Sequence, residues 1–171
     1  VFLWGALHDR PRCWACEERN WPAALLADRP LPSPACLSRR MRRLSMQLFF
    51  DAVMHAARAQ LPDHLIKCID AKPLVVGGYS KDRDAKRGRA ANGFDKGYKL
   101  FAVYDGAGVN SWQIGPMNQA EVKVAPQLLH VAAREHGGGY LLGNSLYDSN
   151  QLYRLADEHG MQRVSRRQRP G

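Results

Sequence analysis

Two polar residues, Asp70 and Asn144, end two segments that the sequence predicts as strands, Leu65–Asp70 and Tyr140–Asn144. If these strands are neighbours in a sheet, their ends lie about 4.8 Å apart. Carboxylates at such ends can share divalent cations about 3.5–4 Å apart, which is the geometry of two-metal phosphoryl transfer. Asp70 taken alone would be only a turn residue at a strand end. The topology makes it a candidate metal ligand.

The pattern after Pro62 predicts the elements that bring these residues together. Strands are expected at 65–70, 98–104, 109–114, 140–144 and 161–165, with Pro73 limiting the first of them. Helices are expected from the capping pattern at Asn118 to His136 and over Ser149–His159. The order βββαβαβ gives a mixed sheet, antiparallel at one edge and parallel at the other. We therefore predict an α/β domain over residues 62–171.

Residues 1–61 are predicted to form a separate helical region, for which DNA binding is one option. Ser33 and Pro34 give an N-cap followed by proline at the first helical position, and the helix that they start is expected to run through Arg39–Arg43. Apolar spacing from Met46 to Ala57 indicates a further helix. The core of this region is expected to contain three tryptophans, Trp4, Trp14 and Trp21.

The positive charge of the chain is concentrated in three clusters. The 171 residues include 25 Lys and Arg against 16 Asp and Glu, a net charge of +9. Residues 39–43 hold four arginines, residues 81–99 hold seven cations against three aspartates, and residues 163–169 hold four arginines. Such clusters suit the phosphates of nucleic acid. The candidate DNA-binding residues are Arg39, Arg40, Arg42, Arg43, Lys81, Arg83, Lys86, Arg87, Arg89, Lys99, Arg166 and Arg167.

Several classes of protein are disfavoured. The longest apolar run, Val1–Leu7, is far shorter than the roughly 20 residues that span a bilayer and lacks the flanks of a signal peptide, so no membrane partner is expected. Cysteines among predicted helices and strands favour a reducing compartment. Cys13 and Cys16 are expected to be buried on one helical face, with a zinc site as the alternative. Because the first residue is valine, the chain is expected to be an internal piece of a longer protein.

Three stretches resemble bacterial insertion-sequence transposases of the DDE class. They are Ile69–Asp82, Lys96–Leu100 and Gly143–Asn150. N-terminal segments are similar to the helical region that precedes the catalytic domain in the same proteins: Leu7–Pro11, Trp14–Cys16, Asn20–Pro22 and Leu37–Arg42. The likeness covers nearly the whole chain. It implies a ribonuclease-H-like fold with a metal-binding Asp-Asp-Glu triad.

The chemistry implied by the resemblance is Mg²⁺- or Mn²⁺-dependent hydrolysis at element ends, followed by attack of the freed 3′-hydroxyl on target DNA. Asp70 matches the first acid of the family, both as a catalytic residue and as a metal ligand. Asn144 stands in the place of the second acid, and the third, a glutamate, is expected beyond Gly171. Asp148 is the alternative metal ligand, although an acid in its position also suits the N-terminus of the following helix.

These departures from the triad predict a chain that is catalytically dead or severely impaired. An amide adds no negative charge, and Mg²⁺ is usually held through carboxylates. Asn144→Asp alone is not expected to restore cleavage. Two alternatives stay open, a non-catalytic DNA-binding relic of a transposase and a metal-dependent nuclease of the same fold. The resemblance also implies double-stranded DNA (element ends and target) as partner, a homodimer on DNA, and a bacterial cytoplasmic, DNA-associated location.

Overall fold

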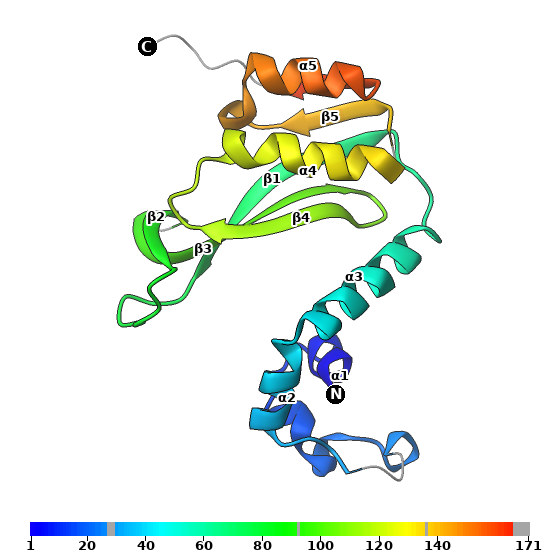
Figure 1. Cartoon of the computed structure of the whole chain (residues 1–171), viewed down its shortest axis with the longest axis vertical. Coiled ribbons are helices and arrows are strands. Elements are labelled where there is room, and N and C mark those ends of the chain that lie inside the picture. Colours follow the sequence, from blue (N-terminus) through cyan, green and yellow to red (C-terminus); the bar gives the residue numbers. More distant parts are fainter. Residues whose placement is uncertain (27–29, 92, 136, 166–171) are drawn as a thin grey trace. The chain divides into compact units, whose positions relative to one another are not determined.

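The computed structural model describes residues 1–26, 30–91, 93–135 and 137–165. The chain forms two compact units, Val1–Ala57 and Arg58–Gly171. Figure 1 labels their elements along the chain. No helix within the described ranges is both long and apolar enough to cross a membrane.

The first unit begins with short helices around packed aromatic rings. Helix α1 (Phe2–Leu7) is followed by three single-turn 3₁₀ helices, η1 (Trp14–Cys16), η2 (Glu18–Asn20) and η3 (Ala23–Leu25). Trp4 stacks on Trp21 with ring centroids 4.9 Å apart. His8 contacts both Trp4 and Trp14, with centroids 4.2 Å and 5.5 Å apart. The predicted tryptophan core is confirmed.

The basic cluster at 39–43 lies across the end of a helix. Helix α2 (Pro34–Met41) begins after Ser33, whose hydroxyl accepts a hydrogen bond from the Cys36 backbone N–H at 3.3 Å, as the capping pattern predicts. Arg39 and Arg40 lie in its last turn, whereas Arg42 and Arg43 lie between α2 and α3 (Leu44–Arg58). The prediction of one helix through the whole cluster is therefore wrong. All four arginines are exposed.

The second unit is a six-stranded mixed sheet with two helices on one face (Figure 1). Its strands are β1 (Ile66–Val75), β2 (Lys86–Ala90), β3 (Gly93–Asp105), β4 (Val109–Pro116), β5 (Gly139–Gly143) and β6 (Met161–Ser165). The order is β2-β3-β1-β5-β6, with β4 also paired to β3. β5 is parallel to β1 and β6, and all pairs of β3 are antiparallel. The helices are α4 (Glu121–Glu135) and α5 (Asn150–Glu158).

Alternation along the strands separates a covered face of the sheet from an open one. Ile69, Phe101 and Leu141 are buried in one core with apolar residues of α4 and α5. Residues at the alternate positions, including Asp70, lie on the opposite face, which neither α4 nor α5 covers. That open face carries large apolar side chains that remain exposed: Ile66, Tyr104, Trp112, Ile114, Tyr140 and Val164.

The turn between β3 and β4 is held by a buried ion pair. The Asp105 carboxylate accepts hydrogen bonds from Arg58 Nη1 at 3.2 Å and Nη2 at 2.5 Å. It also accepts from the backbone N–H groups of Ala107 at 2.8 Å and Gly108 at 3.1 Å. Burial raises the pKa of Asp105, but these hydrogen bonds outweigh burial and lower it to about 2. The hairpin turn predicted at 105–108 is confirmed.

Strand β1 is longer than predicted. It continues through Asp70 and Pro73 to Val75, so Asp70 lies inside the strand and not at its end. β5 pairs only with Ile66–Ile69, so the later part of β1 has β3 as its only partner strand in the register. Proline lacks an N–H and is tolerated where one side of a strand is unpaired. Pro73 therefore does not end the strand.

The basic segment from Lys81 to Lys99 is also more regular than predicted. It contains β2 and the beginning of β3, which pair from Lys86↔Gly97 to Ala90↔Gly93. The segment was expected to be a loop, because Lys-Arg-Gly-Arg-Ala shows no apolar alternation. The order of strands and helices along the described part of the second unit is therefore ββββαβαβ, with one strand more than the sequence predicts.

Candidate functional site

A pocket of about 400 Å³ lies where the parallel strands end. Asp70 and Asn144 both line it, together with Cys68, Ile69, Tyr104, Leu142, Gly143, Val164 and Ser165. The last registered pair of β1 and β5 is Ile69↔Gly143, so Asp70 and Asn144 each follow that pair directly. The topology thus brings together the two residues that the sequence singled out, even though Asp70 does not end its strand.

Asp70 presents its carboxylate on the open face. It is exposed and pairs with Ala102 of β3. Its strand neighbour Ile69 points into the core, as alternation requires. Burial raises the pKa of the Tyr104 phenol in the same pocket, and the charges of Cys68 and Asp70 raise it further. The pocket therefore combines one solvent-facing acid with a phenol that stays protonated.

Asn144 has a structural role in addition to its place in the pocket. Its Oδ1 accepts a hydrogen bond from the Leu146 backbone N–H at 2.8 Å and caps the 3₁₀ helix η4 (Ser145–Tyr147). The preceding residue must be small, because a Cβ on Gly143 would lie 2.8 Å from Ile69 Cγ2 and 3.0 Å from Arg163 Nη2. The local fold therefore fixes the backbone that carries Asn144.

Asp148, the alternative metal ligand, is not among the residues that line the pocket. It is half-buried and lies between η4 and Ser149, whose hydroxyl caps α5 by accepting from the Leu152 backbone N–H at 3.2 Å. This position agrees with the other expectation for Asp148, an acid at a helix N-terminus.

The residues present do not fit a two-metal site. The pocket offers one carboxylate, Asp70, and one amide oxygen, which already accepts the hydrogen bond from Leu146. In the described part of the chain, no group of three or more His, Cys, Asp or Glu is arranged to hold a metal ion. The pocket residues therefore give no basis for a metal-dependent step.

Cys13 is exposed and Cys16 is half-buried, so the predicted burial of both thiols is wrong for Cys13.

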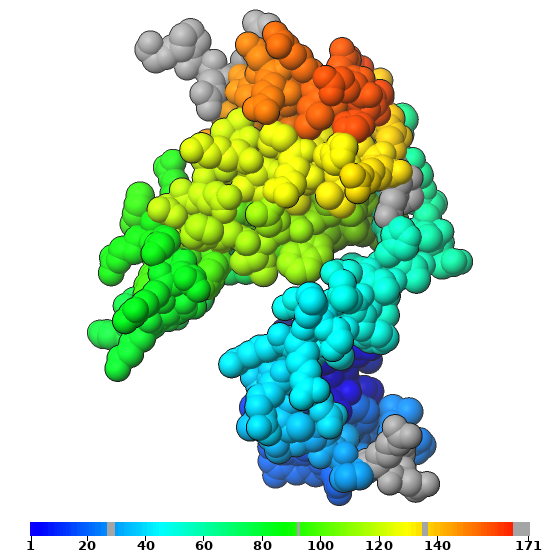
Figure 2. Space-filling model, in the orientation of Figure 1, coloured from blue at the N-terminus to red at the C-terminus, as the bar shows by residue number. Residues whose placement is uncertain are grey.

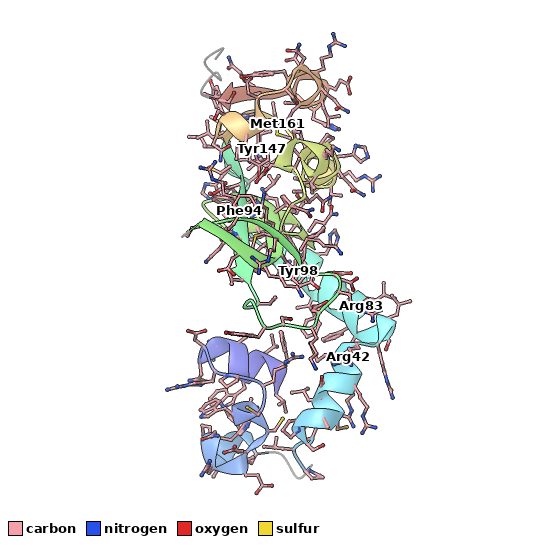
Figure 3. The ribbon with its side chains drawn as sticks, turned by 90° about the vertical axis from the view of Figure 1, so that its left-hand side faces the viewer. Arg42, Arg83, Phe94, Tyr98, Tyr147 and Met161 are labelled. Atoms are coloured by element: carbon pink, nitrogen blue, oxygen red, sulfur yellow. The ribbon has the colours of Figure 1, made fainter. Side chains whose placement is uncertain are left out.

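Two buried polar side chains behind the pocket were not found from the sequence. Figure 3 labels Tyr147, which is fully buried. Arg163, counted above in a surface cluster, is only 7% exposed, and its Nη1 donates to the Leu141 carbonyl oxygen at 3.2 Å. Burial raises the pKa of Tyr147 and lowers that of Arg163. Within the described residues, the Tyr147 hydroxyl and the Arg163 Nε and Nη2 have no hydrogen-bond partner.

The predicted DNA-binding residues of the second unit fall into three groups. Lys81, Arg83, Lys86, Arg87 and Arg89 are exposed on β2 and the loop before it. Lys99 is bound to Glu121 of α4 at 2.6 Å and lies on the covered side of β3, opposite to the side that carries Arg87 and Arg89. Arg166 and Arg167 lie outside the described residues, as does Arg169 of the third cluster.

Polar contacts order the loop before β2. The Tyr98 hydroxyl donates to Asp82 Oδ2 at 2.7 Å, and Lys96 Nζ donates to the Ser80 carbonyl oxygen at 2.6 Å. The bond to Asp82 raises the pKa of Tyr98 to about 12 and lowers that of Asp82. Figure 3 shows Tyr98 on β3 and Arg83 on this loop. As far as the structure describes the chain, the side chains of four cations here form neither an ion pair nor a hydrogen bond: Lys81, Arg83, Arg87 and Arg89.

Comparisons with known proteins match both the sequence and the fold. A family model described as the transposase DDE domain matches residues 61–169. No curated protein sequence matches the chain significantly.

The chain is structurally similar to the piggyBac transposase synaptic complex with hairpin DNA, with a TM-score of 0.54 and 9% sequence identity over 81% of this chain and 31% of that chain. The Mos1 transposase paired-end complex with left transposon end gives a TM-score of 0.42 and 14% identity over 77% of this chain and 50% of that chain. The likeness to the piggyBac structure confirms the predicted ribonuclease-H-like α/β class. This chain spans under a third of that relative's length.

Proposed function

Because the chain belongs to the transposase DDE domain family, matched over residues 61–169, we propose that it binds double-stranded DNA and is impaired in cutting it. The observation that carries this proposal is the pocket in which Asp70 and Asn144 meet, beside a surface of unpaired cations. The acid stands where the family's chemistry expects one, and the amide stands where it expects a second. Binding and cutting are therefore separable in this chain.

DNA binding is supported by charge and by the fold. Lys81, Arg83, Arg87 and Arg89 are exposed on the second unit, and the arginines of 39–43 are exposed on the first. Cations that replace the counterions of DNA phosphates release them, which favours binding at low salt. The piggyBac structure of the same fold class was determined with hairpin DNA. Phosphate contacts of this kind position a protein on DNA without selecting a sequence.

Impaired cutting is supported by the charge of the pocket. The family's cation, Mg²⁺ or Mn²⁺, is held through carboxylates, and Asn144 contributes an uncharged amide with one oxygen lone pair committed to Leu146. Asp70 alone supplies a single negative charge. The pocket should therefore bind a divalent cation weakly, and the carboxylate pair needed to share two cations is missing.

DNA binding is tested with fluorescence anisotropy of a labelled mixed-sequence duplex and the whole chain. We expect binding that weakens steeply as the salt concentration rises, because several phosphates are neutralised. Replacing Arg83 and Arg87 with glutamine should weaken binding and reduce the salt dependence. Arg154→Gln, an exposed arginine of α5 on the covered side of the sheet, is the matched control. Absence of salt-dependent binding would overturn this half of the proposal.

The pocket is tested by Mn²⁺ binding, followed by electron paramagnetic resonance, and by duplex cleavage with Mg²⁺ or Mn²⁺. We expect Asn144→Asp to bind Mn²⁺ more tightly than the natural chain, and Asp70→Asn to bind it more weakly. The natural chain should cleave no faster than Asp70→Asn. Rapid cleavage by the natural chain that is abolished in Asp70→Asn would show that the domain is an active nuclease or transposase, contrary to the proposal.

A further inference from the structure

Strands β2 and β3 extend beyond the rest of the sheet as a two-stranded ribbon, formed by residues 86–90 of β2 and residues 93–96 of β3. β3 pairs with β1 only from Gly97 onward and with β4 only from Tyr98 onward. Residues 93–96 of β3 therefore have β2 as their only strand partner in the register. Figures 1 and 2 show the green part of the chain, which contains β2, the loop before it and the beginning of β3, at one end of the second unit. Among the described residues, the buried core of the second unit includes none from this ribbon.

The register places a mixed basic and aromatic set on one face of the ribbon. Arg87 pairs with Lys96 and Arg89 pairs with Phe94, and paired residues point to the same side of an antiparallel sheet. Glycines stand on the other side, where a Cβ on Gly88 would overlap Met117 and a Cβ on Gly97 would overlap the Leu74 backbone oxygen. The arginines and the phenyl ring therefore share the side on which Lys96 and Tyr98 also contact Ser80 and Asp82 of the loop before β2.

This face is continuous with the face that carries the pocket. Alternation along β3 takes Phe94 and Lys96 to Tyr98, Leu100 and Ala102, with no register shift before Val103. Ala102 pairs with Asp70, so the ribbon face and the Asp70 face are the same surface of the sheet. A duplex that reaches the pocket along this surface would also meet the ribbon.

The positive charge of the ribbon does not explain why the apolar side chain of Phe94 is exposed. Its side chain is 76% exposed, beside a guanidinium group rather than an apolar neighbour. Arginines alone would indicate phosphate binding or solubility. An apolar side chain held on a rigid two-stranded element between cations suits a partner that offers phosphates and flat apolar rings within a few ångströms of one another. DNA offers both.

We infer that the two strands of the ribbon form a DNA-distorting arm in which Arg87 and Arg89 bind phosphates and Phe94 enters the base stack. The inference rests on the proposed DNA binding of this unit. A two-stranded β-ribbon is narrow enough to enter a DNA groove. Inserted phenylalanine side chains unstack base steps and kink the duplex. The arm would therefore open the duplex on the surface that leads to Asp70.

The charge of β2 favours DNA, and not a second copy of the chain, as the partner of the arm. β2 is an edge strand and edge strands can pair with one another. Two such edges would, however, bring Arg87 and Arg89 of one copy against the same cations of the other, with no acidic residue on β2 to offset them. Self-association through the ribbon would therefore contradict the proposed role of the arm.

The test uses the whole chain, a labelled mixed-sequence duplex, and permanganate oxidation, which attacks thymines that are unstacked. We expect the natural chain to create reactive thymines in the bound duplex. Phe94→Ala should abolish them and weaken binding by about tenfold, the effect of losing one base–aromatic contact. Phe94→Trp keeps a flat ring and should preserve both the reactivity and the affinity.

Charge and insertion are separated by the salt dependence of binding. Arg87→Gln and Arg89→Gln should each lower the slope of log K against log salt by about 0.9, whereas Phe94→Ala should leave the slope unchanged. Arg154→Gln again serves as the control. If Phe94→Ala binds and unstacks the duplex like the natural chain, or if the ribbon variants change only self-association, the arm is refuted while DNA binding stands. If the natural chain does not bind the duplex, both proposals fail.

Discussion

One strand, β3, passes through two regions that are held together by different forces. In the sheet body (β1, β4, β5, β6, α4, α5 and β3 from Tyr98), Phe101 is 0% exposed against the helices. In the ribbon, Phe94 of the same strand is 76% exposed. The body is stabilised by apolar burial and the ribbon by backbone pairing and a few polar contacts. Substitutions in the body should therefore change folding, and substitutions in the ribbon should change binding.

The largest expected effect comes from Asp105 in the sheet body. Asp105→Asn leaves the Arg58 guanidinium, which is 4% exposed, without its counter-charge. Breaking a buried ion pair by removing one partner costs about 3–5 kcal/mol of unfolding free energy. Urea unfolding of the whole chain, followed by hydrogen exchange at the β3 and β4 amides, measures this loss. An unchanged exchange midpoint would show that the body does not depend on the pair.

A double variant and the pH sharpen this prediction. Arg58→Met with Asp105→Leu removes both charges and should recover part of the loss. The folded pKa of Asp105 is about 2, below the ordinary value of 3.8, so its contribution is complete above pH 4 and is lost as the pH falls towards 2. The difference between the natural chain and Asp105→Asn should therefore shrink over that interval.

A smaller effect is expected at Gly97, where the ribbon joins the body. A Cβ on Gly97 would overlap the Leu74 backbone oxygen and lie 3.0 Å from Met117 Cε, so Gly97→Ala should overpack the joint and cost about 1–3 kcal/mol. Gly78→Ala is the matched control, because nothing lies within 4 Å of a Cβ there. Equal unfolding curves for the two variants would mean that the joint is not tightly packed.

The smallest effect is expected at Tyr98, which ties the loop to the ribbon. Tyr98→Phe removes the hydrogen bond to Asp82 and should leave global unfolding unchanged while hydrogen exchange in residues 79–85 speeds up several-fold. Ultraviolet titration should lose the phenol that ionises near pH 12. If a phenol that ionises near pH 12 persists in Tyr98→Phe, the assignment of that pKa to Tyr98 is wrong.

The proximity of Asp70 and Asn144 could be predicted from the sequence, on the expectation that the strand after the first helical crossover lies beside the first strand of the sheet, and β5 does pair in parallel with β1. Strand β2 could not, since its lysine and arginines give no apolar alternation and it is defined only by pairing with β3. Arg163 belongs to a basic cluster in the sequence, and nothing in that cluster indicates that its side chain is buried. Its burial depends on residues distant in sequence, among them Tyr153, over whose ring the guanidinium lies 5.8 Å from the centroid.

The capping of η4 by Asn144 affects how the charge of this pocket can change during evolution. Asparagine and aspartate accept a backbone N–H equally well in this position, so exchanging one for the other leaves η4 and the strand ends intact while the pocket gains or loses a negative charge. Folding provides no selection between the two states. A single exchange between asparagine and aspartate at this position would therefore change the charge of the pocket without a change in stability.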